Sequence, residues 1–259
     1  MTPVLAFDIE SVPDIEGLRR LYALRPEVKA GDVAEMAFQM RRQTTGTDFL
    51  PLHLHRVVAI ACALRDRDGF TVWSLGDVHT GEAELIKRFF DGVEKYTPQL
   101  VSWNGGGFDL PVMHYRGLIH GVRAARYWDL GEDDKDFKWN NYISRYHQRH
   151  LDLMDLLALY QPRNNVPLDE MAKLIGFPGK LGMEGAGVWE AYQAEKIAEI
   201  RNYCETDAVN TYLLYLRFQL MRGVFSEDQY RRECDVVRAN LSKSAEPHWR
   251  EFLNEWRAA

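Results

Sequence analysis

The chain has 259 residues, of which 46% are hydrophobic and 12% aromatic, enough apolar surface for one large folded unit. Its net charge of −6 argues against a wide, sequence-independent clamp on duplex nucleic acid, which needs a strongly basic face. The sequence contains no transmembrane run and no basic stretch followed by an apolar leader. Cys62, Cys204 and Cys234 form neither a zinc pattern nor a disulfide framework, which favours a reducing cytoplasm. We therefore predict a single domain over residues 1–259, located in the cytoplasm and without membrane contact.

Residues 3–11 read as a first strand that carries two acids inside an apolar run. Side chains two positions apart on a strand project from the same face, so Asp8 and Glu10 are expected to lie together, opposite Phe7 and Ile9. Two such carboxylates raise each other's pKa unless a cation neutralises them. Oxygen ligands at this spacing suit Mg²⁺ or Mn²⁺, whereas the plainer alternative is a strand end with solvated acids.

The next segments predict an insertion, a hairpin and a helix. Residues 14–48 carry six basic side chains with apolar residues at roughly helical spacing, which indicates either an amphipathic surface helix pair or a basic flap. Residues 55–66 and 70–75 read as strands joined by a turn at Asp68 and Gly69. Residues 81–96 are helical in pattern, and residues 100–103 form a further strand.

That strand runs into the sequence Asn-Gly-Gly-Gly-Phe-Asp-Leu-Pro, residues 104–111. Glycines let another backbone or a ligand approach closely. Asp109 stands where a helix N-cap is expected, and Pro111 is tolerated in the first turn of a helix over residues 110–120. A plain strand–turn–helix cap remains the alternative. The loop is neither a P-loop nor a dinucleotide fingerprint.

The second half of the chain is expected to be mainly helical. Residues 121–149 mix basic and aromatic side chains, which fits either a grip on single-stranded nucleic acid or a loop packed by its own rings. Residues 151–160, 167–176, 189–221 and about 226–257 read as helices. Between them, Lys180 with Gly182 and Gly185 indicates an anion-holding turn or a flexible connector.

Tyr203 and Asp207 lie four residues apart in the long helical stretch and therefore share a face. By itself this pair is commonplace. The order strand–strand–strand–helix–strand–helix, followed by helices, predicts an α/β fold with a mixed central sheet.

Three short patterns, occurring in order, resemble one known family. Asp8-Ile9-Glu10, then Asn104 with Phe108-Asp109 and Pro111, then Tyr203 with Asp207, resemble the three exonuclease motifs of the DEDD superfamily in its tyrosine-bearing branch. The wording is most similar to the 3′–5′ exonuclease domain of family-B DNA polymerases and to stand-alone proteins related to it. The segments 150–155 and 180–185 also look like that stand-alone group. The resemblance implies an α/β ribonuclease H-like fold, a mixed central β-sheet flanked by α-helices.

The resemblance also implies roles for individual residues. Asp8, Glu10, Asp109 and Asp207 would hold two Mg²⁺ or Mn²⁺ ions, with Asp8 serving both, Glu10 and Asp207 the nucleophile side, and Asp109 the other side. Tyr203 would orient the attacking water, since a phenol with a pKa of about 10 is a poor general base at neutral pH. A second group would contact the terminal nucleotide: Ile9, Asn104 and Phe108.

The function that this implies is hydrolysis of phosphodiester bonds from the 3′ end of single-stranded nucleic acid, with release of nucleoside 5′-monophosphates. DNA is favoured over RNA as substrate, and a polymerase or repair partner acting in trans is compatible with the absence of a polymerase domain. The alternatives are an RNA 3′–5′ exonuclease, a non-catalytic nucleic-acid-binding module on the same fold, and a hydrolase of small phosphoesters.

Overall fold

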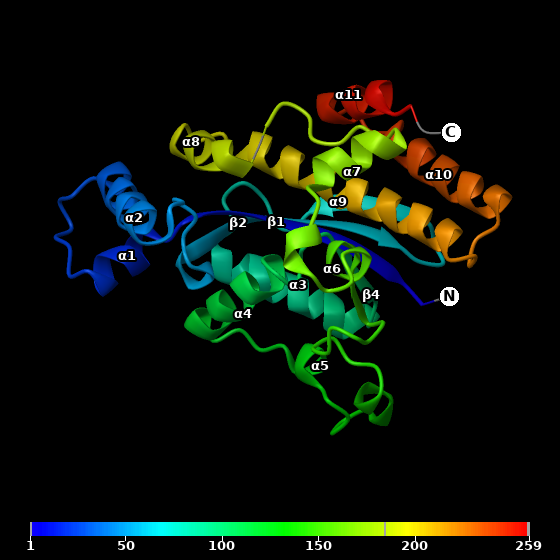
Figure 1. The fold of residues 1–259 in the computed structure, drawn as a ribbon, viewed down its shortest axis with the longest axis horizontal. Coiled ribbons are helices and arrows are strands. Elements are labelled where there is room, and N and C mark those ends of the chain that lie inside the picture. Colours follow the sequence, from blue (N-terminus) through cyan, green and yellow to red (C-terminus); the bar gives the residue numbers. More distant parts are fainter. Residues whose placement is uncertain (1, 184, 258–259) are drawn as a thin grey trace.

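The computed structural model describes residues 2–183 and 185–257 and contains a five-stranded mixed sheet between two layers of helices (Figure 1). The strands are β1 (Val4–Pro13), β2 (His55–Arg65), β3 (Phe70–Ser74), β4 (Gln99–Ser102) and β5 (His150–Asp152). Their order across the sheet is β3-β2-β1-β4-β5. The first three are antiparallel neighbours, and β4 and β5 continue the sheet in parallel with β1. This confirms the predicted ribonuclease H-like α/β fold.

The helices occur in chain order between and after the strands. They are α1 (Ile15–Leu21), α2 (Ala30–Thr45), α3 (Glu82–Tyr96), α4 (Asp109–His120), α5 (Ala125–Trp128), α6 (Leu153–Leu157), α7 (Leu168–Ile175), α8 (Val188–Gln193), α9 (Ile197–Met221), α10 (Glu227–Leu241) and α11 (Pro247–Glu255). Among the described residues, no helix combines the length and the apolar character that crossing a membrane requires.

The alternation of β1 explains how the two layers form. Leu5, Phe7 and Ile9 point into a core with α3 and α4, while Val4 and Ala6 point into the opposite core with α9. On that second face β2 presents alanines at positions 59, 61 and 63, and their small side chains let α9 lie close to the sheet. Asp8 and Glu10 belong to the face that α9 covers, so the strand pattern itself delivers both acids to this helix.

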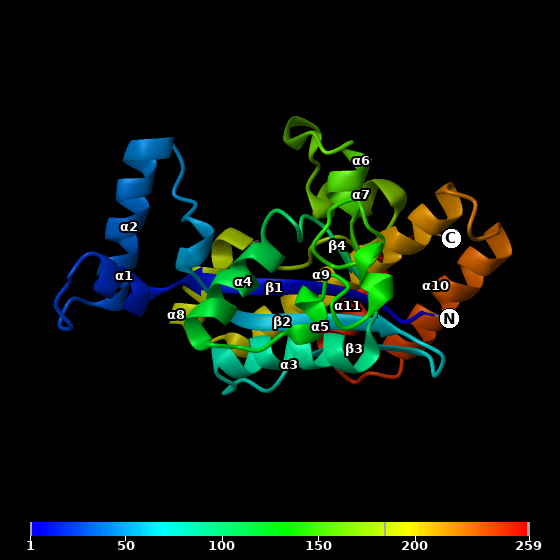
Figure 2. The same ribbon diagram turned by 90° about the horizontal axis from the view of Figure 1, so that it is seen from below.

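The segment 14–48, called the arm below, projects from one end of the sheet (Figure 2). It consists of α1 and α2 and closes on a small core of its own with Leu18, Val33 and Leu50. A buried network fixes its base: Asp14, which caps α1, pairs with Arg116 of α4, and Arg116 also binds Glu82 of α3 with a nitrogen–oxygen distance of 2.6 Å. The arm is therefore helical, as the spacing of its apolar residues predicts.

Three boundary predictions were wrong. Residues 150–152 form strand β5, where a helix over 151–160 was expected, because three residues carry too little periodicity to separate the two classes. The stretch 189–221 is interrupted between α8 and α9, where Glu195 adopts a left-handed φ of 60°. The predicted terminal helix over about 226–257 is two helices, α10 and α11, separated at residues 242–246.

Candidate active site

Four carboxylates from three distant segments meet beside the sheet, as the sequence motifs predict. We call Asp8, Glu10, Asp109 and Asp207 the carboxylate cluster; all four line one cavity of about 960 Å³. The first two come from β1, the third from the start of α4 and the fourth from α9. A register shift between Glu10 and Ser11 interrupts the β1–β2 pairing, a type of irregularity that commonly re-aims side chains next to functional sites.

Asp109 lies at the site because it does not cap its helix. The prediction placed it at the N-cap, but Phe108 holds that position and Asp109 is the first helical residue. Its carboxylate instead accepts a hydrogen bond from the backbone N–H of Ile9 at 3.1 Å. This bond ties the loop after β4 to the strand that carries Asp8 and Glu10, so one main-chain donor brings two of the motifs together.

The glycine loop that precedes Asp109 is packed too tightly for larger residues. A Cβ atom at position 105 or 107 would overlap the side chains of Ser102 and Asn104, respectively. Asn104 itself has a left-handed φ of 70°. The carboxylate of Asp152 accepts hydrogen bonds from the N–H groups of Asn104 at 3.0 Å and Gly106 at 2.8 Å. Asp152, part of the segment 150–155 whose role the sequence left open, therefore holds the loop in place.

Tyr203 and Asp207 share one face of α9, as their spacing predicts, and both are buried. The structure adds Lys180, for which the sequence left an anion-holding turn and a connector as alternatives. Its ammonium donates a hydrogen bond to the Tyr203 hydroxyl and lies 3.4 Å from Oδ2 of Asp207. The signal for this residue was a lone lysine among glycines, and its partners are 23 and 27 positions away.

The charges of the cluster are only partly balanced. Burial, together with the charges of the neighbouring acids, raises the pKa of Asp8 well above its usual range, and burial with the charge of Asp207 does the same for Glu10. Burial raises the pKa of Asp109 to about 7 and that of Asp207 to about 6, although the Lys180 charge acts in the opposite direction on Asp207. The carboxylates nevertheless hold the pKa of Lys180 above its ordinary value despite burial. The cluster thus strongly attracts cations.

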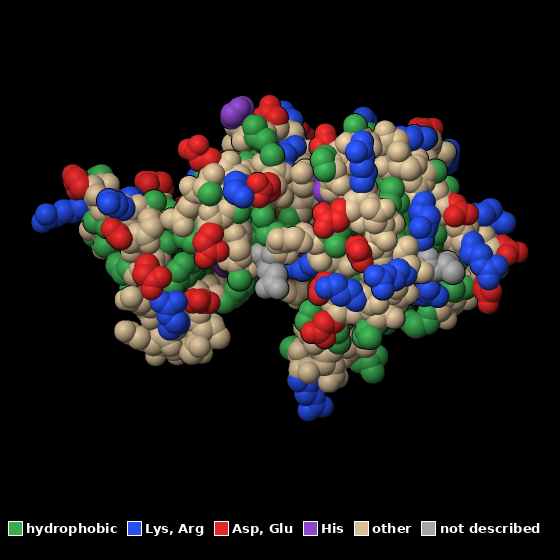
Figure 3. All heavy atoms as spheres, turned by 90° about the horizontal axis from the view of Figure 1, so that it is seen from above, with side chains coloured by type: hydrophobic (Ala, Val, Ile, Leu, Met, Phe, Trp, Pro, Cys, Tyr) green, Lys and Arg blue, Asp and Glu red, His purple; other side chains and the backbone are tan. Residues whose placement is uncertain are grey.

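The wider cavity is also acidic. It is lined by seven carboxylates against Arg42 and Lys180, and Arg42 is paired with Glu35 of the arm at 2.5 Å. In the space-filling view from above, a hollow opens between the projection made by α2 and the part of the molecule that contains α6 (Figure 3). A phosphate chain entering this cavity needs cations to offset the carboxylates.

The three residues predicted to contact the terminal nucleotide have different surroundings. Phe108 lines the cavity and packs edge-on against His55 with ring centroids 5.2 Å apart. Asn104 lines it as well. The N–H of Ile9 is already used by Asp109, and its side chain packs in the core on the opposite face of β1. Substrate contact therefore stays a prediction for all three, and Phe108 and Asn104 are the two whose side chains belong to the cavity region.

Cys204, predicted to be a small buried residue, is buried, and it also contacts the cluster. Its thiol donates to the backbone oxygen of Asp8 at 3.2 Å, and its sulfur lies within 4.8 Å of oxygens of Asp8 and Glu10. Burial and the adjacent acids raise the pKa of this thiol well above its usual value, so it stays protonated. Cys204 therefore acts as a donor that orients Asp8.

Comparison with known proteins now places the chain. Residues 47–256 match the family described as a predicted 3′-5′ exonuclease related to the exonuclease domain of PolB. The chain belongs to this family. The matched range includes Asp109, Lys180, Tyr203 and Asp207 but begins after Asp8 and Glu10, which the fold then brings to the same cavity.

Two relatives are DNA polymerases. The chain is 29% identical over 154 residues to the DNA polymerase epsilon catalytic polypeptide of Saccharomyces cerevisiae, covering 58% of this chain and 6% of that polypeptide. It is 27% identical over 177 residues to a DNA polymerase of Thermococcus litoralis, covering 66% of this chain and 10% of that enzyme. The chain thus corresponds to a small part of each relative.

One prediction concerns the charge of the cluster without metal. Asp109→Asn should raise the stability of metal-free protein at pH 8, because the folded state keeps an ionised carboxylate whose pKa, about 7, lies above its unfolded value. The expected gain is of the order of 2–4 kcal/mol and should shrink as the pH falls through 7 toward 4, where both states are protonated. Denaturant unfolding in EDTA at pH 8 and pH 4.5 measures it. A gain independent of pH would show that the carboxylate charge is not its source.

Proposed function

We propose that this protein is a divalent-metal-dependent 3′–5′ exonuclease that shortens single-stranded nucleic acid, with DNA as the preferred substrate, and releases nucleoside 5′-monophosphates. The observation that carries the proposal is the carboxylate cluster, assembled beside Tyr203 in a chain of an exonuclease family. Three sequence motifs that are up to about two hundred residues apart converge on one cavity, which a chance likeness of motifs does not explain.

The donor set fits divalent cations of the Mg²⁺ and Mn²⁺ class. All four acids offer oxygen atoms, their mutual repulsion is relieved only in part by Lys180, and Oδ1 of Asp207 is buried without a hydrogen-bond partner. Asp8, Glu10, Asp109 and Asp207 would hold two such ions. Bound there, the pair supplies Lewis-acid stabilisation of the phosphodiester and lowers the pKa of a nucleophilic water.

The remaining residues would position the reactants. The Tyr203 hydroxyl, held by Lys180, would orient the attacking water rather than take its proton, because burial raises the pKa of the phenol far above neutrality. The Lys180 ammonium lies where it would also meet the negative charge that develops on the phosphate. Phe108 would stack on the terminal base, with Phe49 packed beside it at 5.7 Å between ring centroids.

Tyr203→Phe should reduce the turnover number less than Asp207→Ala does. The first change removes one hydrogen-bonding hydroxyl and keeps the ring, whereas the second removes a cation ligand and leaves Lys180 without its carboxylate partner. We expect losses of about 10-fold and at least about 10³-fold, respectively. Single-turnover rates at saturating Mn²⁺ measure both. Equal losses would mean that Tyr203 has a role beyond orienting water.

Digestion of matched single-stranded DNA and RNA oligomers tests the substrate proposal. Nucleoside 5′-monophosphates should form from both, faster from DNA. Faster release from RNA would favour the ribonuclease alternative. Titration with Mn²⁺ separates the non-catalytic module, since two ions are expected for the enzyme and a binding module has no need of them. A polymerase or repair partner in trans, like the cytoplasmic location, stays a prediction.

A further inference from the structure

A second cavity adjoins the carboxylate site. It measures about 560 Å³, within the usual range of small-molecule sites, and lies among α4, β5, α6 and residues 142–148 and 160–165. Asn104 and Gly107 of the glycine loop line both cavities. A chain that ends at the carboxylate cluster therefore has a continuous route over this loop into the second cavity, which we call the tyrosine cavity.

Two tyrosine rings form the surface that gives the cavity its character. Tyr146 is 70% exposed and meets Tyr160 edge-to-face, with ring centroids 5.1 Å apart. The Arg145 guanidinium lies over the Tyr160 ring at 4.8 Å and is held there by Asp155 at 2.6 Å. An exposed ring beside a fixed guanidinium plane is a stacking platform, and the bases of nucleic acid stack on such platforms whatever their sequence.

The backbone that presents Tyr160 is strained. Leu159 and Tyr160 are consecutive non-glycine residues with left-handed φ values of 51° and 61°. Such conformations cost roughly 1–3 kcal/mol each. The Leu159 side chain, 74% exposed, gains little from packing that would offset this cost. What the turn achieves is to direct the Tyr160 ring toward Tyr146 and Arg145, and backbone strain of this kind is concentrated at ligand-binding sites.

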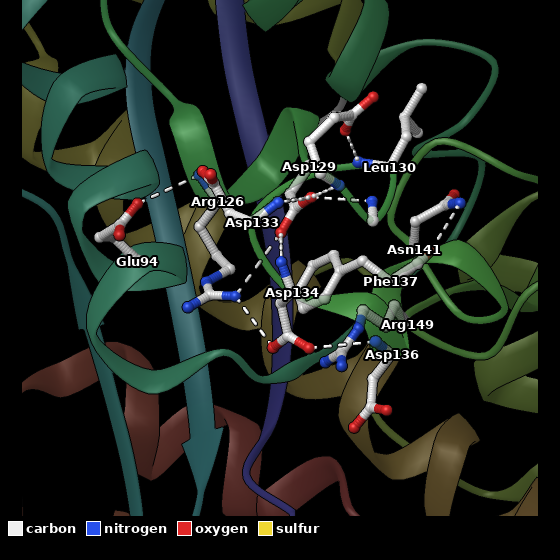
Figure 4. A network of polar contacts seen from close by, with 12 residues as sticks. Glu94, Arg126, Asp129, Leu130, Asp133, Asp134, Asp136, Phe137, Asn141 and Arg149 are labelled. Carbon is white, nitrogen blue, oxygen red and sulfur yellow. Dashed lines mark hydrogen bonds and ion pairs between the residues drawn. The ribbon is translucent and has the colours of Figure 1, made fainter.

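The remainder of the 121–149 segment is committed to packing. Arg126 and Arg149 lie beside Phe137, at 5.1 and 3.9 Å from its ring, and Arg126 also pairs with Asp134 at 3.1 Å (Figure 4). Asp129 accepts hydrogen bonds from four backbone N–H groups of residues 131–134. The loop is thus held rigidly by its own side chains, and Tyr146 extends from a fixed base.

The charges of the tyrosine cavity select for a base rather than a phosphate. Arg145 is paired with Asp155, and both oxygens of Asp152 are occupied by the glycine loop. Burial lowers the pKa values of His114 and His150 to about 4, so both are neutral. The lining therefore offers rings and hydrogen-bonding groups without an excess of positive charge.

We propose that the tyrosine cavity is a second subsite of the nuclease, which receives an unpaired base of the substrate strand a few nucleotides from its 3′ end and stacks it on Tyr146 and Tyr160. The proposal rests on the proposed function, because the strand is the one whose end lies at the carboxylate cluster. It makes the enzyme dependent on an unpaired tail longer than the terminal nucleotide.

Equilibrium binding of 5′-fluorescein oligomers of 3 and 12 deoxythymidines, measured by anisotropy in EDTA, tests the proposal. Tyr146→Ala and Tyr160→Ala should weaken binding of the 12-mer by about 5- to 100-fold, the effect of losing one stacked base, and change binding of the trimer less than twofold. Tyr146→Phe should bind both oligomers like the unsubstituted protein, because stacking does not use the hydroxyl. Tyr96→Ala, which removes an exposed ring at the end of α3, is the matched control.

Three outcomes decide. If Tyr146→Ala and Tyr160→Ala bind the 12-mer as Tyr96→Ala does while the unsubstituted protein degrades DNA, the subsite is wrong and the proposed function stands. Equal losses for the trimer and the 12-mer would place these rings at the terminal nucleotide and also overturn the subsite. If the unsubstituted protein neither binds the 12-mer nor degrades it with Mn²⁺, the proposed function and the subsite fail together. Because Tyr146 is largely exposed, Tyr146→Ala should keep the thermal unfolding midpoint unchanged, and that is checked first.

Discussion

Replacing Asp8 with alanine is expected to lower the rate of 3′-end hydrolysis by at least about 10³-fold while the protein stays folded. Asp8 is the acid that each of the other three carboxylates surrounds: Glu10 on the same strand face, Asp109 through the Ile9 hydrogen bond, and Asp207 across from α9. Its loss should therefore disrupt both cation positions. Single-turnover rates and Mn²⁺ stoichiometry measure the effect together.

The control for this change is Asp66→Ala. Asp66 is an acid in the β2–β3 turn, where it accepts hydrogen bonds from its own turn only. It should retain full activity and metal binding. Near-normal hydrolysis by Asp8→Ala protein, with the same metal requirement, would mean that the carboxylate cluster is not the active site.

Replacing Lys180 with methionine is expected to have two opposite effects. The turnover number should fall about 10²-fold, because Tyr203 loses the donor that holds its hydroxyl and the phosphate loses a positive charge. The affinity for Mn²⁺ should instead rise several-fold, because a cation 3.4 Å from Asp207 no longer competes for the cluster. Calorimetric titration with Mn²⁺ and single-turnover kinetics separate the two effects.

Lys173→Met provides the comparison for Lys180→Met, since Lys173 is an exposed lysine on α7 that also pairs with an aspartate, Asp169. It should change neither quantity. A loss of turnover in Lys180→Met without any gain in metal affinity would argue that the ammonium swings away from the carboxylates when cations bind, and unchanged turnover would remove Lys180 from the site.

How far the sequence predicted the structure depends on the range of each signal. Asp8 and Glu10 were placed on one face from strand periodicity alone, and the four-residue spacing of Tyr203 and Asp207 did the same on a helix. Both are local rules of backbone geometry. Bringing the pairs together required the family resemblance, because periodicity does not specify which elements pack against each other.

The features that sequence reasoning missed arise from tertiary contacts. Lys180 belongs to a glycine-rich connector, and only the fold shows its ammonium against Tyr203. Asp109 was predicted to cap α4, but a donor a hundred residues away, the N–H of Ile9, takes its carboxylate instead. Asp152 ends a strand of only three residues, too short to announce itself, yet it holds the glycine loop. In each case a local preference gives way to a partner distant in sequence.

The central claim is tested most directly by incubating a 5′-labelled single-stranded DNA oligomer with the protein in Mg²⁺, Mn²⁺ or EDTA, beside Asp8→Ala and Asp207→Ala. The account predicts a ladder that shortens from the 3′ end with either cation, stays absent in EDTA and is lost in both variants. An oligomer that remains intact with every cation, or a ladder that both variants still produce, would contradict it.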